Sequence, residues 1–269
     1  MKIGNREFNT EKHTYVMGIL NITPDSFSDG GRYNRLNEAL YHVEQMIHEG
    51  MDILDIGGES TRPGYQLLED EEEIARVIPV IEAVKHRFDI PISLDTYKSA
   101  VAAEGIRVGI DLVNDIWGLR YHNNMAEVIA QSGLPCCLMH NRKKAEYTSF
   151  MQEVAADLSE TLYLADKAGI SRDKIILDPG VGFAKSYEQN LQIINHLELF
   201  HALDCPILLG ASRKSVIGLT LETPIDDRLE GTLATTVLAV VKHCAFIRVH
   251  DILPNVRCIR MTEAILNQD

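Results

Sequence analysis

The stretch MGILNITPDSFSDGG, residues 17–31, begins as an apolar strand and ends in a concentration of turn-forming residues. Its first part belongs to the run YVMGILN (15–21), which is continuously apolar, as a strand covered on both faces should be. Asn, Thr, Pro, Asp, Ser and Gly then dominate residues 21–31. A buried strand followed by so many turn-forming residues is typical of a scaffold that carries its functional residues on the loops after the strands.

Further short apolar runs follow along the chain, and segments of helical period separate them. The eight runs, in order, are YVMGILN (15–21), MDILDIG (51–57), PISLDT (91–96), DLVNDI (111–116), PCCLMH (135–140), KIILDPG (174–180), PILLGAS (206–212) and AFIRVHD (245–251). Helical spacing of apolar residues occurs at Leu36, Leu40, Val43 and Ile47, at Ile74, Val77, Ile78, Ile81 and Val84, and at Leu191, Ile194 and Leu197. A final helix after Pro254 would place Val256, Ile259 and Ile265 inward.

Strands that alternate with helices predict a parallel sheet with crossover helices. Eight such units in about 250 residues match a (β/α)₈ barrel, formed here by a single domain over residues 1–269. A doubly wound open sheet is the alternative that periodicity leaves open. The loops after the first two strands are the longest, so we expect them to act as mobile lids.

Composition narrows the classes of protein. Of the 269 residues 45% are hydrophobic, yet no run reaches the roughly 20 apolar residues of a membrane span, and MKIGNREFNTEKH has no apolar signal core. We therefore expect a soluble cytoplasmic protein. The net charge of −13 argues against a nucleic acid or an anionic membrane as partner. Five cysteines, an odd number without C-x-x-C spacing, predict buried free thiols.

Three polar residues stand at the ends of neighbouring strands: Asp95, Asn114 and Asp178. Buried carboxylates repel one another, so a cationic group or one rich in N–H donors should lie between them. A flat heterocycle with an amino-imino edge fits, because each carboxylate can accept two charge-assisted hydrogen bonds. The alternative is that each residue caps a helix or pairs with a nearby lysine.

A cationic set follows the ends of the second, seventh and eighth strands. Barrel enzymes often bind phosphate with the loops after the seventh and eighth strands. Its members are Arg62, Arg213, Lys214, Arg248 and His250, with hydroxyl donors at Ser60 and Thr61. Ordinary surface cations are the alternative, which fits poorly for Arg248 and His250 because they lie in an apolar strand. Convergence of Arg62, Arg248 and His250 requires runs 51–57 and 245–251 to end side by side.

Seven segments, taken in chain order, resemble the dihydropteroate synthase family. They are Met17–Gly31, Asp55–Gly64 (DIGGESTRPG), Asp95–Ser99 (DTYKS), Asn114-Asp115, Asp178–Phe183, Gly210–Gly218 (GASRKSVIG) and Arg248–Asp251. The resemblance implies a (β/α)₈ barrel that joins p-aminobenzoate to 6-hydroxymethyl-7,8-dihydropterin diphosphate, with release of pyrophosphate and with Mg²⁺. The chain departs from the commoner pattern at Trp117 and at HNRKK (140–144).

The resemblance also implies roles for single residues. Asp95, Asn114, Asp178 and Lys214 would hold the pterin, and Thr61, Arg62, Arg248 and His250 the diphosphate. Asn21 would bind Mg²⁺ through its amide oxygen. The p-aminobenzoate pocket would comprise Phe27, Pro63, Phe183, Lys214 and Ser215. Arg62, Lys214, Arg248 and His250 form the expected catalytic set.

Two other functions share parts of this pattern. A pterin-binding methyltetrahydrofolate corrinoid methyltransferase has no diphosphate to hold, so the STRP, SRKS and RVH segments argue against it. A non-catalytic pterin-binding protein could keep Asp95, Asn114 and Asp178 without Arg62, Lys214 or Asn21, but all of these are present. We expect no partner beyond the small-molecule substrates, apart from a second copy of the chain in a homodimer.

Overall fold

A parallel β-barrel forms the centre of the computed structural model, which describes residues 1–22, 32–59, 67–122 and 124–268. Its strands are β3 (Tyr15–Asn21), β4 (Ile53–Gly57), β5 (Ile92–Asp95), β6 (Leu112–Asp115), β7 (Cys136–Met139), β8 (Ile175–Asp178), β9 (Leu208–Leu209) and β10 (Phe246–Val249). The strands follow one another around the barrel in chain order, and a parallel bridge between Leu177 and Ile207 joins β8 to β9. The predicted barrel is confirmed, and the open sheet is excluded because no strand order reverses.

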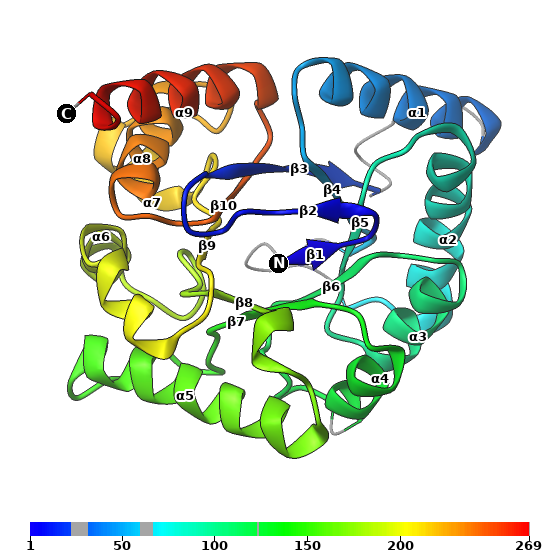
Figure 1. Ribbon diagram of the computed structural model, residues 1–269, viewed down its shortest axis with the longest axis horizontal. Coiled ribbons are helices and arrows are strands. Elements are labelled where there is room, and N and C mark those ends of the chain that lie inside the picture. The colour runs from blue at the N-terminus through cyan, green and yellow to red at the C-terminus, as the bar shows by residue number, and fades with distance from the viewer. Residues whose placement is uncertain (23–31, 60–66, 123, 269) are drawn as a thin grey trace.

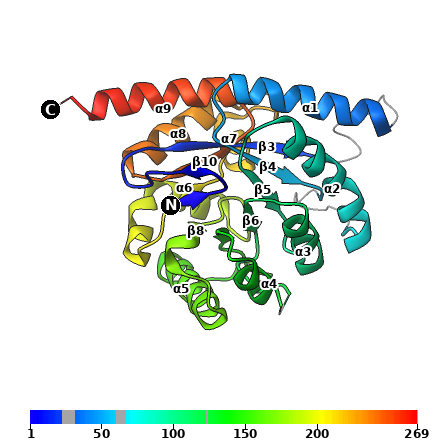
Figure 2. The ribbon, with the colours of Figure 1, turned by 45° about the vertical axis from the view of Figure 1, so that its right-hand side comes forward.

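Helices form a ring outside the barrel, one after another in chain order (Figure 1). They are α1 (Arg32–His48), α2 (Asp70–Arg87), α3 (Ser99–Arg107), α4 (Met125–Ser132), α5 (Phe150–Ala168), α6 (Tyr187–Asn195), α7 (Ser215–Leu221), α8 (Leu229–Val241) and α9 (Ile252–Leu266), with the 3₁₀ turns η2 (Arg172–Lys174) and η3 (Leu197–Leu203). The last helix, α9, lies next to the first, α1, so that the ring closes (Figure 2).

Local sequence explains why these segments form strands and helices. Every residue of β4 is buried, because helices cover the outside of the barrel and side chains fill its inside. Four acidic residues open α2 (70–73) and three basic residues close it (85–87), each set at the end of the helix dipole that it stabilises. Ser186 and Gln189 form a reciprocal capping box at the start of α6.

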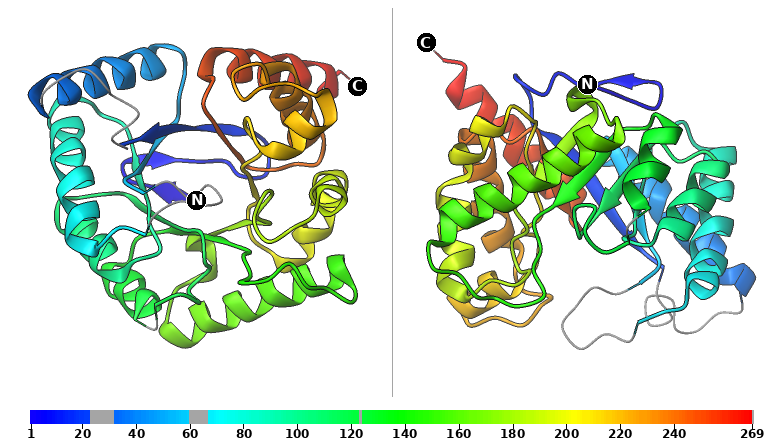
Figure 3. Two further views of the ribbon diagram at one scale, coloured as in Figure 1. Left: turned by 180° about the vertical axis from the view of Figure 1, so that it is seen from behind. Right: turned by 90° about the horizontal axis from the view of Figure 1, so that it is seen from below.

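A short antiparallel hairpin precedes the barrel, and the sequence pattern did not predict it. Its strands, β1 (Lys2–Ile3) and β2 (Arg6–Glu7), are too short to show alternation. Buried Ile3 and Phe8 pack with Met17 and Phe246 from the barrel strands in one apolar cluster. The hairpin therefore covers the amino end of the barrel (Figure 3) and leaves the carboxyl ends of the strands for the functional residues.

Three predicted details of the helices were wrong. Helix α9 begins at Ile252, so Pro254 lies in its first turn, where a missing N–H costs nothing. Ile265 is 60% exposed because it is the last residue but one of α9. Leu191 is 40% exposed, whereas Ile194 and Leu197 are buried as predicted.

Two predictions from composition can be compared with the structure. All five cysteines are free thiols, as predicted, and four of them are buried, whereas Cys258 is partly exposed. Among the described residues, no helix is both long and apolar enough to cross a membrane.

Candidate active site

A buried ion cluster lies at the carboxyl end of the barrel, where β4, β5 and β10 direct side chains inward. The Arg248 guanidinium donates from Nε to Asp55 Oδ2 at 2.6 Å and from Nη2 to Asp95 Oδ2 at 2.6 Å. Asp55 is fully buried, and the Asn114 amide nitrogen approaches its Oδ1 at 3.4 Å. One cation thus bridges two carboxylates, which at this depth would be unstable without it.

The protonation of Asp95 depends on opposing effects. Burial raises its pKa to about 7, while the charge of Arg248 lowers it and that of Asp55 raises it. In the parallel pairing of β5 with β6, Asp95 lies opposite Asn114. The two predicted residues are therefore adjacent, as their positions at the strand ends suggested.

Asp178 ends β8, beside β7 in the barrel. Its Oδ1 accepts a hydrogen bond from the Gly180 N–H at 2.7 Å. Burial raises the pKa of this carboxyl, and the Lys214 and Arg248 charges oppose that effect. Asp178 therefore belongs to the same electrostatic site as Arg248, although the two side chains share no direct hydrogen bond in the described residues.

Lys214 follows β9 and approaches the loop after β8. Its ammonium donates to the Val181 carbonyl and lies 4.5 Å from the centre of the Phe183 ring. Burial lowers its pKa to about 8, the Arg248 charge lowers it further, and Asp178 and Asp95 act in the opposite direction. The structure thus brings together Lys214 and Phe183, while Ser215 is exposed at the first position of α7.

The cationic set predicted from the sequence divides into two groups. Arg248 and His250 lie two positions apart at the end of β10, and the His250 Nδ1 atom is 3.0 Å from Ser212 Oγ. Arg213 instead makes a bidentate ion pair with Asp251, at 3.0 and 2.6 Å, and adopts a left-handed φ of 57°. Asp251 therefore neutralises the Arg213 charge, and the part of Arg213 in the cationic site stays a prediction.

The expectation that the second and eighth strands of the barrel, β4 and β10, end side by side was wrong. Strand β3 lies between β4 and β10 in the sheet. Their side chains meet nevertheless, because Arg248 extends through the barrel interior to Asp55. Arg248 and Asp55 therefore meet across the barrel interior and not along its wall, and Arg62, which was expected to converge with Arg248 and His250, lies outside the described residues.

Asn21 lies at the carboxyl end of β3, beside Gly57 of β4. Its Oδ1 atom is 3.9 Å from the point where a Cβ on Gly57 would lie, and Asp95 Oδ2 is 3.7 Å from the same point. The amide oxygen is therefore at the mouth, near the ion cluster. Four predicted residues lie outside the described residues: Phe27, Thr61, Arg62 and Pro63. The segments expected to act as lids, like Ser60, also lie largely there.

A small apolar cluster adjoins the polar groups at the same end of the barrel. Tyr97, Ile116 and Met139 form its buried part, and Trp117 and Phe183 pack against it. Such a surface next to carboxylates suits a planar ligand with one polar edge.

Asp55 is the residue of the ion cluster that sequence reasoning did not single out. The signal was present, since Asp55 and Arg248 are each the charged residue inside an otherwise apolar strand. Charges buried in this way are almost always paired. The contact between His140 and Lys185 was not predicted either, because no comparable pattern in the sequence marks these two residues.

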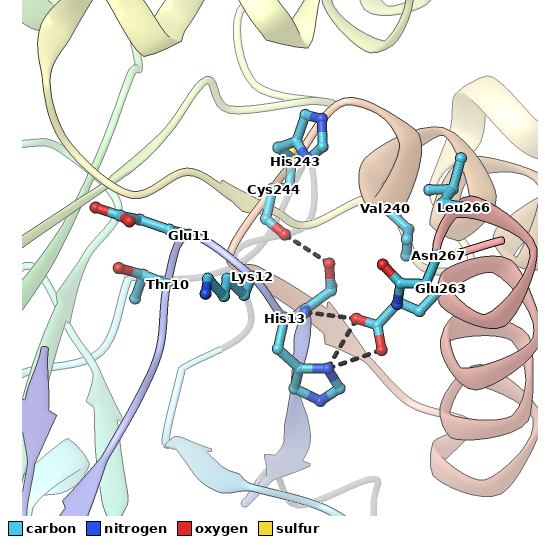
Figure 4. Close-up of a pocket in the computed structure, with 11 residues that line it drawn as sticks. Thr10, Glu11, Lys12, His13, Val240, His243, Cys244, Glu263, Leu266 and Asn267 are labelled. Carbon is cyan, nitrogen blue, oxygen red and sulfur yellow. Dashed lines mark hydrogen bonds and ion pairs between the residues drawn. The ribbon is translucent and has the colours of Figure 1, made fainter. Parts of the chain in front are cut away.

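A separate pocket lies at the opposite end of the molecule (Figure 4). Its lining includes His13, whose Nδ1 lies 2.8 Å from Glu263, and Thr14, which donates from its backbone to Glu263 and from its hydroxyl to Cys244. These polar groups satisfy one another, and the pocket lies at the amino ends of β3 and β10. It therefore contributes nothing to the site at the mouth.

A buried ion network supports the loop that follows β4. Lys98 donates to Glu59 at 2.6 Å, to Glu73 at 2.7 Å and to the Leu68 carbonyl at 2.7 Å. The Tyr97 hydroxyl donates to the other Glu59 oxygen at 2.6 Å. Lys98 thus joins the residues on both sides of segment 60–66 to α2.

We expect the substitution Lys98→Met to lower the free energy of unfolding by about 3–5 kcal/mol, because it leaves two buried carboxylates without a counter-charge. Urea unfolding measures this loss. The matched control is Lys85→Met on α2, which removes a pair with Asp111 at 3.1 Å whose lysine is 35% exposed. The control should cost no more than about 1 kcal/mol; an equal loss in both variants would contradict the prediction.

Comparison with known proteins agrees with this geometry. Residues 17–250 match the family described as pterin binding enzymes. A dihydropteroate synthase of Clostridium beijerinckii is 54% identical over 269 residues, which is the full length of both chains. The solved dihydropteroate synthase of Clostridium difficile, described in the presence of pteroic acid, has 48% identity and a TM-score of 0.95, and the match covers 97% of this chain and 100% of that one.

A third relative is described with a different small molecule. The dihydropteroate synthase of Xanthomonas albilineans, described with 4-aminobenzoic acid, has 38% identity and a TM-score of 0.91, over 96% of this chain and 94% of that one.

The barrel and its carboxylate-lined mouth, together with these matches, define a pterin-binding enzyme. Within that class, the chain belongs to the dihydropteroate synthase family, whose members are transferases. The corrinoid methyltransferase and the non-catalytic pterin-binding protein are therefore the less supported alternatives.

Proposed function

We propose that Asp95, Asn114 and Asp178 bind the amino-imino edge of the pterin in this protein. The observation that carries the proposal is the buried cluster at the mouth, in which carboxylates outnumber the one bridging guanidinium of Arg248. A ring with several N–H donors supplies the hydrogen bonds that buried carboxylates require. The apolar cluster beside them supports a planar ligand.

The proposed substrates are 6-hydroxymethyl-7,8-dihydropterin diphosphate and p-aminobenzoate, and the products are 7,8-dihydropteroate and pyrophosphate. Pteroic acid and 4-aminobenzoic acid, with which two relatives are described, support this assignment. Phe183 and Ser215, with Lys214, would bind the aryl amine. Phe27 and Pro63 are assigned to the same pocket from the sequence alone.

The leaving group would be held by Arg248 and His250, while Lys214 would contact the pterin. Arg248 has five N–H donors, and its contacts with Asp55 and Asp95 are made through Nε and Nη2, so Nη1 can serve an anion. Thr61 and Arg62 complete this set on sequence grounds. Cations at this position would stabilise the negative charge that develops as pyrophosphate departs.

Mg²⁺ is the proposed cofactor, and Asn21 is its proposed ligand. The structure fits this role in two respects: the amide oxygen lies at the mouth, and no hydrogen bond engages the Asn21 side chain within the described residues. Mg²⁺ commonly takes one or two protein oxygens and completes its shell with phosphate oxygens and water. When bound, it would neutralise part of the diphosphate charge.

The residue types also suggest an order of events. Departure of pyrophosphate leaves positive charge on the pterin methylene, which the electron-rich ring shares and which Asp95 and Asp178 stabilise. The neutral aryl amine then attacks the methylene carbon and loses a proton. An amine of this kind needs no strong base, so the site requires no paired base and nucleophile among its residues.

We expect Asp178→Asn to weaken pterin binding by about ten- to several-hundred-fold, because a donor would face the ring donors and a charge-assisted hydrogen bond is worth roughly 1.5–3 kcal/mol. Isothermal calorimetry measures the affinity, and a thermal melt should show a folded protein. Asp111→Asn, the same change at the amino end of β6, is the control and should bind normally. Unchanged affinity in folded Asp178→Asn would mean that this carboxylate is only structural.

The reaction should depend on the charge of Lys214. Because burial lowers its pKa to about 8, the ammonium form is lost as the pH rises through that value. We expect kcat/KM for the pterin diphosphate to fall about tenfold per pH unit above this point. In Lys214→Arg the guanidinium stays charged, so the decline should move to higher pH. A decline at the same pH in both proteins would assign it to another group.

We further propose that the enzyme acts in the cytoplasm as a homodimer. The free thiols of the five cysteines support a reducing compartment. Neighbouring helices α7 and α8 (Figure 1) expose a set of large apolar side chains: Leu219, Leu221, Val237, Leu238 and Val241. A second copy of the chain would remove this surface from water.

Light scattering coupled to size exclusion tests the dimer. The unmodified protein should have the mass of two chains, and Val237→Glu should shift it towards one, because a buried unpaired carboxylate opposes association. The control, Tyr163→Glu, changes a side chain that is 65% exposed on α5, outside the apolar set, and should leave the mass unchanged. A single-chain mass for the unmodified protein would refute the proposal.

A further inference from the structure

The loop that follows β8 has an unusual backbone. Gly180, Gly182 and Ala184 all have left-handed φ angles, of 73°, 85° and 45°. The backbone at Gly180 also packs so tightly that a Cβ there would lie 2.0 Å from the His140 carbonyl oxygen. A loop of this shape does not follow from local preference alone, so contacts from outside must hold it.

Lys185 provides the central contact. Its ammonium donates to the Gly180 carbonyl at 2.9 Å, to the Phe183 carbonyl at 3.0 Å and to His140 Nδ1 at 2.8 Å. An ammonium group has three N–H bonds, so all of them are used. One side chain thus joins the beginning of the loop, its aromatic residue and the end of β7.

His140 connects this lysine to helix α5. The ring is completely buried, and because Nδ1 accepts from Lys185, its Nε2–H donates to Asp157 Oδ2 at 3.0 Å. Burial and the Lys185 charge lower the pKa of His140 to about 3, which agrees with a neutral ring. Arg142 holds Asp157 in turn, from Nε at 2.6 Å and from Nη2 at 3.2 Å.

We propose that Lys185 is a positioning residue for the aryl amine substrate: through His140 and Asp157 it fixes the place of the Phe183 ring. The inference rests on the proposed function, in which Phe183 lines the amine pocket. None of these three residues touches a substrate in this scheme. They act by holding the loop.

The structure separates this role from pterin binding. Asp178 is paired with Met139 in the sheet, and the Leu177–Ile207 bridge holds β8 on its other side. Phe183 lies beyond the sheet, where its carbonyl depends on Lys185. Loss of the ammonium should therefore displace the ring of Phe183 and leave the position of the Asp178 carboxylate unchanged, although it removes one of the positive charges that lower the pKa of that carboxylate.

Other contacts keep the loop from unfolding when the ammonium is removed. Gly182 N–H donates to Asn190 at 2.6 Å, and the Tyr147 hydroxyl donates to the Ala184 carbonyl at 2.9 Å. These contacts hold the outer part of the loop. We therefore expect a shifted ring in a folded protein.

The protonation of Lys185 gives a second readout. Burial lowers its pKa to about 7; the charges of Lys214 and Arg142 act in the same direction, and those of Asp178 and Asp157 oppose it. A neutral amine has only two N–H bonds, so one of the three acceptors is lost above that pH. The KM for p-aminobenzoate should then rise with pH through this range.

The experiment is steady-state kinetics of Lys185→Met with saturating pterin diphosphate and Mg²⁺. We expect the KM for p-aminobenzoate to rise about 10- to 100-fold, with kcat and the pterin affinity within about threefold of the unmodified protein, as for a lost ground-state contact. The part of the KM rise that begins near pH 7 should be absent in this variant, whereas any effect of Lys214, which both proteins contain, should remain.

The matched control is Lys174→Met. Lys174 lies just before the amino end of β8 and donates to the Gly133 carbonyl at 2.6 Å, so this variant makes the same residue change and loses one exposed lysine hydrogen bond far from the mouth. The KM of Lys174→Met for p-aminobenzoate should equal that of the unmodified protein. Should Lys185→Met fail to fold, Lys185→Gln, which keeps one amide donor group, is expected to give the same pattern in a smaller degree.

Three outcomes would overturn the inference: a KM within twofold of the unmodified value, an equal change in the control, or an equal loss of amine and pterin affinity. Absence of pterin binding and pyrophosphate release in the unmodified protein would instead overturn the proposed function, and this inference with it.

Discussion

The contact of Arg248 with Asp55 and Asp95 is the interaction on which the site depends. Each carboxylate is a charge taken from water into the barrel, and such a charge needs a partner at hydrogen-bond distance. The strand order meets this requirement, because β4 and β10 flank β3 and direct their charged residues inward. The carboxylates around Arg248 still outnumber its guanidinium, so this part of the mouth suits the N–H-rich edge of a ring. The Arg248 guanidinium therefore connects the order of the strands, the charge balance of the mouth and the class of ligand that fits there.

Much of the fold could be predicted because its signals are local. A strand buried on both faces reads as a short apolar run, and eight such runs alternate with helical spacing. Asp95, Asn114 and Asp178 were identifiable for the same reason, since each ends such a run and the ends of parallel strands meet at one edge.

The remaining features depend on partners that are distant in the sequence. Nothing near Arg213 shows that Asp251 will neutralise it, and nothing near Lys185 points to His140. The amino-terminal hairpin has strands of two residues, too short for any period to appear, and only the apolar side chains of Ile3 and Phe8 indicate that it packs against the barrel. Contacts of this kind are set by tertiary packing, which periodicity does not encode.

The apolar cluster at the mouth has a practical consequence. Trp117 packs against it, and the sequence contains no other tryptophan. Indole emission from this protein therefore comes from one known position, on the side of the barrel where ligands would enter, with Tyr121 as an aromatic neighbour at 5.6 Å between ring centres. The chain carries its own optical reporter, so changes at the mouth can be followed by fluorescence without attaching a dye.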